Sequence, residues 1–140
     1  MAIAALDIKK KNLEDLAEYQ RKLWSKPKLT YLFLEVTDCC NLNCKHCGSG
    51  CLSTNRNYMS FETAQKVLDE VAREFDASQI LICITGGEPL LSKDLFKIIN
   101  YSKHLDFSCG MTTNGTLLTS AVGNQLKDAG LDTISISLDG

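Results

Sequence analysis

The sequence predicts an α/β fold built on a parallel sheet, in the arrangement (βα)3β. Four short runs that are apolar on both faces alternate with three segments of helical periodicity from residue 29 onward. Such runs are typical of parallel strands that are joined and covered by helices. The length of 140 residues, with 44% hydrophobic and 23% charged residues, suits one globular domain.

A short helix is expected before the sheet, over residues 12–24, and Pro27 closes it. Its larger apolar side chains share one helical face: Leu13, Leu16, Leu23 and Trp24. We expect this helix to pack at the edge of the domain. The chain then divides into a helical extension, residues 1–28, and a core, residues 29–140.

Strands and helices then follow in strict alternation. The strands are expected at residues 31–36, 80–85, 107–112 and 133–138. Ser60 and Ser92 are the predicted N-caps of the first two helices, and Gly130 is expected to end the third. The third strand is the weakest of the four because Gly110 interrupts it.

Each predicted strand runs into small, polar or metal-binding residues. These segments are residues 37–40, 85–89, 112–115 and 137–140. Ligands of parallel α/β sheets and barrels bind beyond the carboxyl ends of the strands. Because all four ends belong to one edge of one sheet, we expect them to converge on a common site.

The cysteines indicate a metal site at that edge. The chain has seven cysteines, an odd number, and four of them lie within residues 39–47. This clustering argues against a disulfide framework. The spacing C-x3-C-x2-C lets Cys40, Cys44 and Cys47 reach one small inorganic core. A cubane iron–sulfur cluster takes four ligands, so three cysteines leave one iron open.

Structural zinc is the alternative that the cysteine loop leaves open, with Cys51 or Cys39 as a fourth thiolate. Cys51 is otherwise a spare thiol, a substitute ligand in a damaged cluster, or a ligand of another group. Cys39 is expected to point away from the metal. Cys83 and Cys109 lie within strands and are expected to pack as small apolar groups.

The segments CNLNCKHC, ITGGEPLL, TTNG and SISLDG together resemble the radical S-adenosylmethionine (SAM) superfamily, in matching order over residues 29–140. The resemblance implies the N-terminal (βα)3β portion of a partial TIM-like (βα)6 barrel. It also implies that Cys40, Cys44 and Cys47 bind a [4Fe–4S] cluster. In this family the amino and carboxylate groups of SAM chelate the open iron.

The same resemblance assigns SAM contacts to the strand ends. The turn that holds the methionine amino group corresponds to Gly86, Gly87, Glu88 and Pro89. The glycines let backbone approach a ligand closely, and Glu88 offers an acceptor to an ammonium group. Asn114 is either a SAM contact or only a turn residue before Gly115.

Two further strand-end positions and one loop position complete the implied SAM site. Ser137 and Asp139 resemble the residues that contact the ribose hydroxyls or the methionine carboxylate. His46 stands just before the third cysteine ligand, where the loop backs the adenine. No catalytic acid or base is assigned, because in such enzymes the cofactors carry the chemistry.

The implied function is reductive cleavage of SAM to a 5′-deoxyadenosyl radical, which takes hydrogen from a substrate. A low-potential electron donor such as flavodoxin or ferredoxin and sensitivity to oxygen follow from it. By analogy the motifs favour the branch that modifies peptides or proteins and carries a C-terminal auxiliary-cluster domain. Family members continue through two further βα units, so we expect a truncated core. A non-catalytic cluster- or SAM-binding module is the alternative.

Composition excludes several other classes. A net charge of −2 gives no electrostatic footprint for nucleic acid or an anionic membrane surface. No run approaches the roughly 18 apolar residues of a membrane span. The opening MAIAALDI is too short for a signal peptide, so a cytoplasmic protein is expected.

Overall fold

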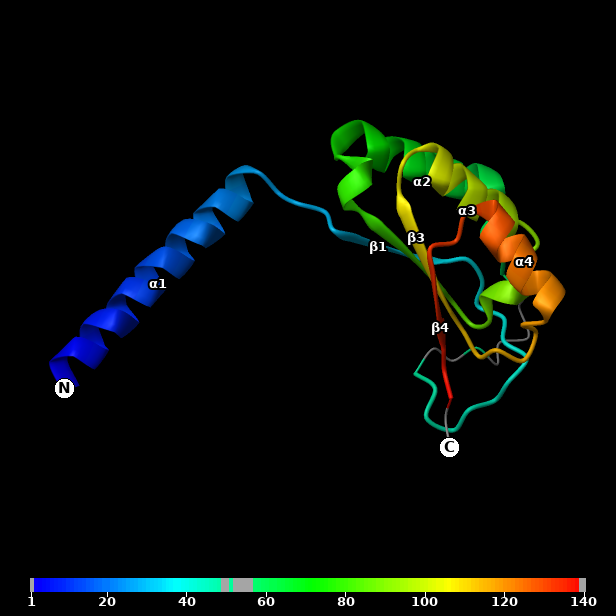
Figure 1. Ribbon diagram of the computed structural model, residues 1–140, viewed down its shortest axis with the longest axis horizontal. Coiled ribbons are helices and arrows are strands. Elements are labelled where there is room, and N and C mark those ends of the chain that lie inside the picture. The colour runs from blue at the N-terminus through cyan, green and yellow to red at the C-terminus, as the bar shows by residue number, and fades with distance from the viewer. Residues whose placement is uncertain (1, 49–50, 52–56, 139–140) are drawn as a thin grey trace.

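The computed structural model describes residues 2–48, 51 and 57–138, and its central feature is a four-stranded sheet (Figure 1). Neighbouring strands are parallel and lie in the order β1-β2-β3-β4. Their bounds are β1 (Tyr31–Glu35), β2 (Leu81–Thr85), β3 (Ser108–Thr113) and β4 (Thr133–Ile136). The predicted α/β class is confirmed, and every strand begins and ends within two residues of its expected range.

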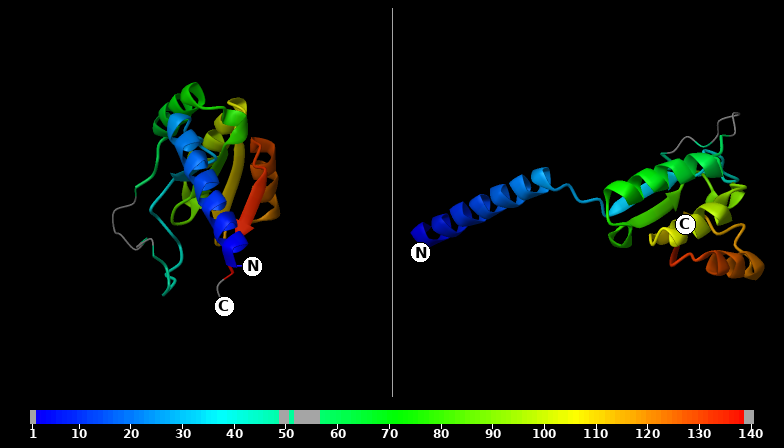
Figure 2. Two further views of the ribbon diagram at one scale, coloured as in Figure 1. Left: turned by 90° about the vertical axis from the view of Figure 1, so that its left-hand side faces the viewer. Right: turned by 90° about the horizontal axis from the view of Figure 1, so that it is seen from above.

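Three helices connect the strands and pack on one face of the sheet (Figures 1 and 2). Their bounds are α2 (Phe61–Glu74), α3 (Leu95–His104) and α4 (Ser120–Ala129). Two short 3₁₀ turns flank β2, namely η1 (Ala77–Gln79) and η2 (Pro89–Leu91). The side chain of Ser60 caps α2 as predicted by accepting the Thr63 N–H at 3.2 Å. Gly130 ends α4 as predicted, with φ of +97°.

The prediction that Ser92 caps α3 is wrong. Ser92 instead ends the η2 turn, where its N–H donates to the Pro89 carbonyl at 2.9 Å. Asp94 occupies the N-cap position of α3. The sequence pattern did not predict the extra turn, which Glu88 caps by accepting the Leu90 N–H at 3.0 Å.

The core lies between the sheet and the three helices. The buried strand residues on this face are Leu34, Ile82, Ile84, Cys109 and Met111. The opposite face is uncovered in the described chain, and Phe33 on it is 67% exposed. Phe33 pairs with Cys83, which pairs with Gly110, so this open face crosses β1, β2 and β3. In a barrel it corresponds to the inner wall.

The first helix, α1 (Ala2–Ser25), extends away from the sheet (Figures 1 and 2). Leu13 and Leu16 are exposed on it, and Trp24 is 88% exposed. The expectation that this helix packs at the edge of the domain is therefore wrong. Helical periodicity predicts which side chains share a face, but it does not predict what covers that face. The helix also begins earlier than predicted, because residues 2–11 contain no glycine or proline to stop it.

No helix within the described part of the chain is both long enough and apolar enough to cross a membrane.

Candidate functional site

The turn after β2 is hydrogen-bonded to the segment that leads into the cysteine loop. The Gly87 N–H donates to the Thr37 carbonyl at 2.8 Å, and the Glu88 N–H donates to the Cys39 carbonyl at 2.7 Å. These two bonds continue the pairing of β1 with β2 beyond the ends of both strands. The backbone next to Cys40 is thereby fixed by the Gly86–Pro89 turn.

Both glycines of this turn are required by close packing. Gly86 has φ of +140°, a conformation that side chains disfavour, and a Cβ there would collide with the Thr37 carbonyl oxygen. A Cβ on Gly87 would collide with the Cys39 carbonyl group. The groups that approach Gly86 and Gly87 so closely are thus the chain's own backbone. Their contact with SAM stays a prediction.

Glu88 is a fully buried carboxylate that joins two strand ends. Its side chain has 0% exposure. Oε1 accepts the Leu90 N–H at 3.0 Å and the Thr113 hydroxyl at 2.7 Å, and Oε2 accepts the Asn114 N–H at 2.8 Å. Such donors satisfy a buried carboxylate that would otherwise be very costly. Glu88 therefore locks the end of β3 to the turn after β2, whatever it also offers to a ligand.

Asn114 connects the end of β3 to the cysteine loop. Its Nδ2 donates to Asn41 Oδ1 at 2.8 Å and lies 3.8 Å from Cys40 Sγ in a donor–sulfur contact. Its Oδ1 accepts the Thr116 N–H at 3.0 Å and the Thr116 hydroxyl at 2.7 Å. Asn41 Nδ2 donates in turn to Thr116 Oγ1 at 2.7 Å. Asn114 thus forms a local turn and also contacts the loop of the predicted metal ligands.

The three predicted metal ligands lie along this loop. Cys40 and Cys44 are half-buried and Cys47 is exposed. The Cys47 N–H donates to the Cys44 carbonyl at 3.1 Å, and the Leu42 N–H donates to Cys40 Sγ at 3.4 Å. No disulfide joins the cysteines of the described residues. Within those same residues, no three metal-binding side chains are gathered closely enough to form a ready-made site.

The base of the cysteine loop is closed by Asp38 and Asn57. Asp38 Oδ1 accepts the Asn57 N–H at 2.8 Å, and Oδ2 accepts the Asn57 side-chain amide at 2.6 Å. The Thr37 hydroxyl donates to the Asn57 carbonyl at 2.9 Å. The bonds from Asn57, backbone first and then side chain, lower the pKa of Asp38. The loop is therefore anchored at both of its ends.

The remaining predicted SAM contacts differ in how the structure places them. The Ser137 N–H donates to the Thr113 carbonyl at 2.9 Å, so Ser137 lies beside the end of β3. His46 is exposed on the cysteine loop, and Pro89 is buried at the start of η2. Asp139 lies outside the described residues. All of these SAM contacts stay predictions.

The cysteines outside the predicted ligand set occupy distinct surroundings. Cys109 is buried in the core, as predicted, and burial raises the pKa of its thiol to about 12. Burial also raises the pKa of Cys83. The buried Cys39 thiol contacts Asp38 Oδ1 at 3.5 Å, whereas Cys51 is half-buried. The role of Cys51 as a spare thiol or a ligand stays open.

Sequence reasoning assigned no role to the residues that hold the loop in place, although segments 37–40 and 112–115 were expected at the site. These residues are Thr37, Asp38, Asn41, Asn57, Thr113 and Thr116. Thr113 and Asn41 were adjacent to predicted site residues, so proximity could have suggested them. Asn57 lies 19 residues from Asp38, and nothing in its local sequence indicates that pairing.

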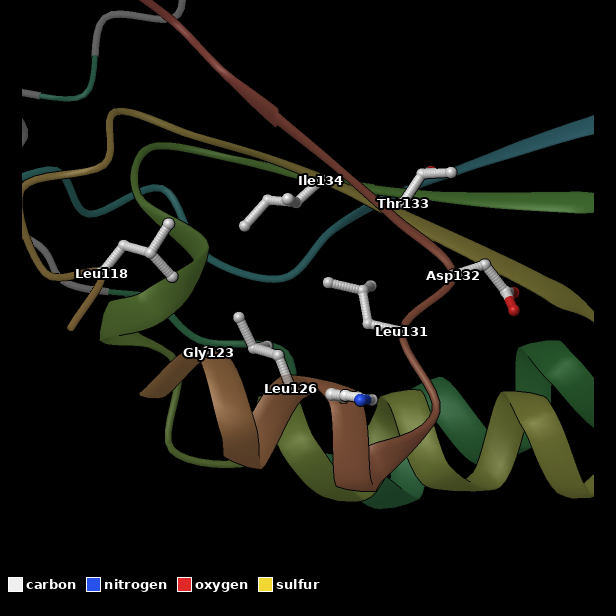
Figure 3. A pocket seen from close by; sticks show the side chains of 8 residues that line it. Leu118, Gly123, Leu126, Leu131, Asp132, Thr133 and Ile134 are labelled. Atoms are coloured by element: carbon white, nitrogen blue, oxygen red, sulfur yellow. The ribbon is translucent and has the colours of Figure 1, made fainter. Parts of the chain in front are cut away.

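Two of the grooves in the described chain lie beside the strands but outside this network. One lies on the open face of the sheet and is lined in part by Phe33, Cys83, Thr85, Thr112 and Ser135. The other lies between α4 and β4, where Leu118, Leu126, Leu131 and Ile134 surround an apolar space (Figure 3). The first groove reaches the strand-end residues Thr85 and Thr112, whereas the second includes no residue of the strand-end segments and is not part of the candidate site.

The donor set and its setting fit an iron–sulfur cluster. Three thiols lie within eight residues of one loop, and that loop is anchored to the ends of β1, β2 and β3. Cys44 and Cys47 are brought toward one another by a backbone turn, and Cys40 has a polar neighbour that suits a thiolate. Cysteine thiolates are the usual ligands of such clusters.

Comparison with known families gives one model match, described as Radical SAM superfamily, over residues 34–140. An AdoMet-dependent heme synthase of Methanosarcina barkeri is 36% identical over 107 residues, covering 76% of this chain and 30% of that protein. A GTP 3′,8-cyclase of Aliarcobacter butzleri is 37% identical over 119 residues, covering 80% and 35%. This chain thus spans about a third of the length of these curated relatives.

Solved structures share the fold. BtrN in complex with AdoMet and 2-DOIA matches with a TM-score of 0.66 and 20% identity, over 77% of this chain and 45% of that chain. Streptococcus suis SuiB bound to S-adenosylmethionine matches with a TM-score of 0.68 and 19% identity, over 93% and 30%. At these identities the likeness concerns the fold alone, and it agrees with the predicted portion of a partial TIM-like barrel.

Proposed function

Because the chain belongs to the radical SAM superfamily, we propose that it binds a [4Fe–4S] cluster through Cys40, Cys44 and Cys47. We further propose that SAM binds beside that cluster, at the carboxyl ends of the strands. The curated relatives are enzymes by name, and the activity of a protein containing this chain is proposed to be of the same general kind.

One observation carries the proposal. Hydrogen bonds join the end of β1 to the turn after β2, that turn to the end of β3, and the end of β3 to the cysteine loop. This ring of bonds supports a site assembled from segments that are far apart in sequence. The predicted ligands and most of the predicted SAM contacts belong to those same segments.

Each group of residues has a proposed part in the site. Three thiolates leave one iron open for the amino and carboxylate groups of SAM. The turn of Gly86–Pro89 orients the amino group, and Ser137 and Asp139 hold the ribose hydroxyls or the carboxylate. His46 backs the adenine, and Asn114 lies between the loop and β3.

The bound cofactors would supply reductive cleavage of SAM and, from it, a carbon radical that takes hydrogen from a substrate. The protein's own residues bind and orient these groups. The open face of the sheet would face the substrate and carries both apolar and polar side chains. The apolar Phe33 and Leu81 lie farther from the carboxyl ends of the strands, and Thr85, Thr112 and Ser135 lie nearer to those ends.

The substrate and the electron donor are proposed only as classes of molecule. A peptide or protein substrate follows from the style of the motifs, whereas relatives are named for heme and GTP chemistry. A flavodoxin or ferredoxin is the proposed electron donor, in the cytoplasm and under anaerobic conditions. Turnover is proposed for a protein that completes the barrel, and SAM binding for the part described here.

Electron paramagnetic resonance of the reduced, anaerobically reconstituted protein tests the proposal. Adding SAM is expected to change the cluster signal, because SAM would bind the open iron. The Cys40→Ala variant is expected to lose the signal, and the matched Cys83→Ala variant is expected to keep it.

Three other outcomes would contradict the proposal in different ways. A cluster signal that SAM does not alter would favour a non-catalytic cluster module. A colourless protein that binds zinc through the same cysteines would favour a structural zinc site. A signal retained in Cys40→Ala but lost in Cys83→Ala would show that the ligands were assigned wrongly.

A further inference from the structure

We propose that Asn114 is a positioning residue whose side-chain amide donates to the Cys40 thiolate and raises the reduction potential of the cluster. The inference rests on the proposed function, since it concerns the ligand environment of the proposed cluster. It gives Asn114 a part that differs from direct contact with SAM. The Asn114 amide nitrogen lies 3.8 Å from Cys40 Sγ.

The orientation of the Asn114 amide is determined by its partners. Oδ1 accepts the backbone N–H of Thr116 at 3.0 Å, and a backbone N–H can only donate. If the amide were flipped, its NH₂ group would face that donor and the bond from the Thr116 N–H would be lost. The NH₂ group must therefore face the cysteine loop, where it meets Asn41 Oδ1 and Cys40 Sγ.

The backbone of Asn114 is held equally firmly. Its N–H donates to Glu88 Oε2 at 2.8 Å, and Glu88 has no exposed surface. The neighbouring Thr113 hydroxyl donates to Glu88 Oε1 at 2.7 Å and accepts the Gly115 N–H at 3.1 Å. If Asn114 moved away from Cys40, a buried carboxylate would lose one of its donors, which is costly. The backbone that carries the Asn114 amide is thus held in place by Glu88 and Thr113.

Asn41, on the cysteine loop, also restricts the position of Asn114 relative to Cys40. It follows Cys40 directly and bonds both Asn114 Nδ2 and Thr116 Oγ1. The loop and the end of β3 are therefore held together at the first metal ligand. Cys44 and Cys47 are joined instead through the loop's own backbone, where the Cys47 N–H donates to the Cys44 carbonyl. Among the described residues, Cys40 is thus the predicted ligand whose sulfur contacts a donor at the end of another strand.

A donor to a ligand sulfur stabilises the more negative state of a cluster. The reduced cluster carries one electron more than the oxidised cluster, so its thiolates attract an N–H more strongly. Hydrogen bonds to the sulfurs are among the factors that set cluster potentials. Removing the Asn114 amide is therefore expected to make one-electron reduction harder, without removing a metal ligand.

The test is a redox titration of the reconstituted cluster without SAM, with dithionite as reductant and paramagnetic resonance as the readout. Wild type, Asn114→Ala, Asn114→Asp and Asn100→Ala are compared. Asn100 is an exposed residue of α3 and makes the matched control. At the potential where half of the wild-type cluster is reduced, Asn114→Ala is expected to show an about tenfold lower ratio of reduced to oxidised cluster. This tenfold change corresponds to a reduction potential lower by about 59 mV for a one-electron step.

Asn114→Asp keeps the shape of the side chain but places an oxygen near the sulfur, so its ratio is expected to fall at least as far. Asn100→Ala is expected to match wild type. SAM affinity, measured on the oxidised proteins, separates the two possible parts of Asn114. Unchanged potentials in both Asn114 variants with full iron content would overturn the proposal. Weaker SAM binding with unchanged potentials would return Asn114 to the SAM site.

Whether the cluster assembles separates failure of the proposed function from failure of the proposal on Asn114. If wild type binds no cluster, the proposed function fails before Asn114 is tested. If wild type and Asn100→Ala assemble a cluster but neither Asn114 variant does, Asn114 is needed for assembly, and the proposal on potential is overturned.

Discussion

Glu88 has a carboxylate with no exposed surface, and three protein donors converge on it. Replacement by glutamine would place an NH₂ group against at least one of these donors. Glu88→Gln is therefore expected to lower the free energy of unfolding by about 1.5–3 kcal/mol, the range for hydrogen bonds to a charged group. Urea unfolding at pH 7 measures this difference.

The exposed Glu70 of α2 supplies the matched control for that substitution. Glu70→Gln is expected to change the free energy of unfolding by less than about 0.5 kcal/mol. Equal stability of the two variants would mean that the donors around Glu88 do not depend on its charge.

Gly87 packs against the Cys39 carbonyl so closely that a methyl group has no room. Gly87→Ala is expected to lower the free energy of unfolding by about 1–3 kcal/mol, because the turn must move off the cysteine segment. Gly123 lies inside α4, where an added Cβ meets nothing within 4 Å. Gly123→Ala is expected to stabilise the protein by about 0.5–1 kcal/mol. Chemical denaturation compares the two, and a stable Gly87→Ala variant would contradict the packing described here.

At the scale of the elements, Asp132 ties β3 to α3 just before β4. Its Oδ2 accepts the Cys109 N–H at 2.7 Å, and both oxygens lie 3.1 Å from Lys103 Nζ. The bond from Cys109, followed by the contact with Lys103, lowers the pKa of Asp132 below its usual value. Because the ionised form is favoured in the folded state, its stabilising effect is present above about pH 4 and is lost as the pH falls further.

Asp132→Asn is therefore expected to be less stable than wild type by about 0.5–1 kcal/mol at pH 7. The difference is expected to narrow as the pH falls below about 4, where the wild-type carboxyl also becomes neutral. Free energies of unfolding at several pH values measure this, with the exposed Asp128→Asn of α4 as a control. A difference that widens on acidification would show that the sign of the pKa shift is wrong.

The elements themselves were largely predictable from the sequence. Apolar runs gave the four strands, and Ser60 and Gly130 gave two helix termini, because these signals are local in the chain. The η2 turn and the N-cap at Asp94 were not predicted, since they depend on how Glu88 is held after β2. The exposure of α1 was not predicted either, because periodicity contains no information about a partner.

The candidate site was predictable in its parts but not in its connections. The four strand ends were expected to converge. In the structure, hydrogen bonds join the ends of β1, β2, β3 and β4. The pairing of Asp38 with Asn57 and the contact of Asn114 with Cys40 span 19 and 74 residues. Contacts over such separations follow from tertiary structure, which a single sequence does not reveal by spacing alone.

At the scale of the whole molecule, the described chain is a parallel sheet with one covered face and one open face. β1 and β4 form its two edges, and the side chains of β4 are exposed along its length. Unpaired strand edges and exposed apolar side chains such as Phe33 favour association. The proposed cluster site lies at the carboxyl ends of these strands, so the proposed function depends most on which metal binds there.

Iron and acid-labile sulfide content after anaerobic reconstitution tests that central claim most directly. The comparison uses wild type, the Cys40/Cys44/Cys47→Ala triple variant and the Cys83→Ala control. About four irons and four sulfides per chain are expected in wild type and Cys83→Ala, with loss of both in the triple variant. Zinc without sulfide in wild type, or a cluster retained by the triple variant, would contradict the account.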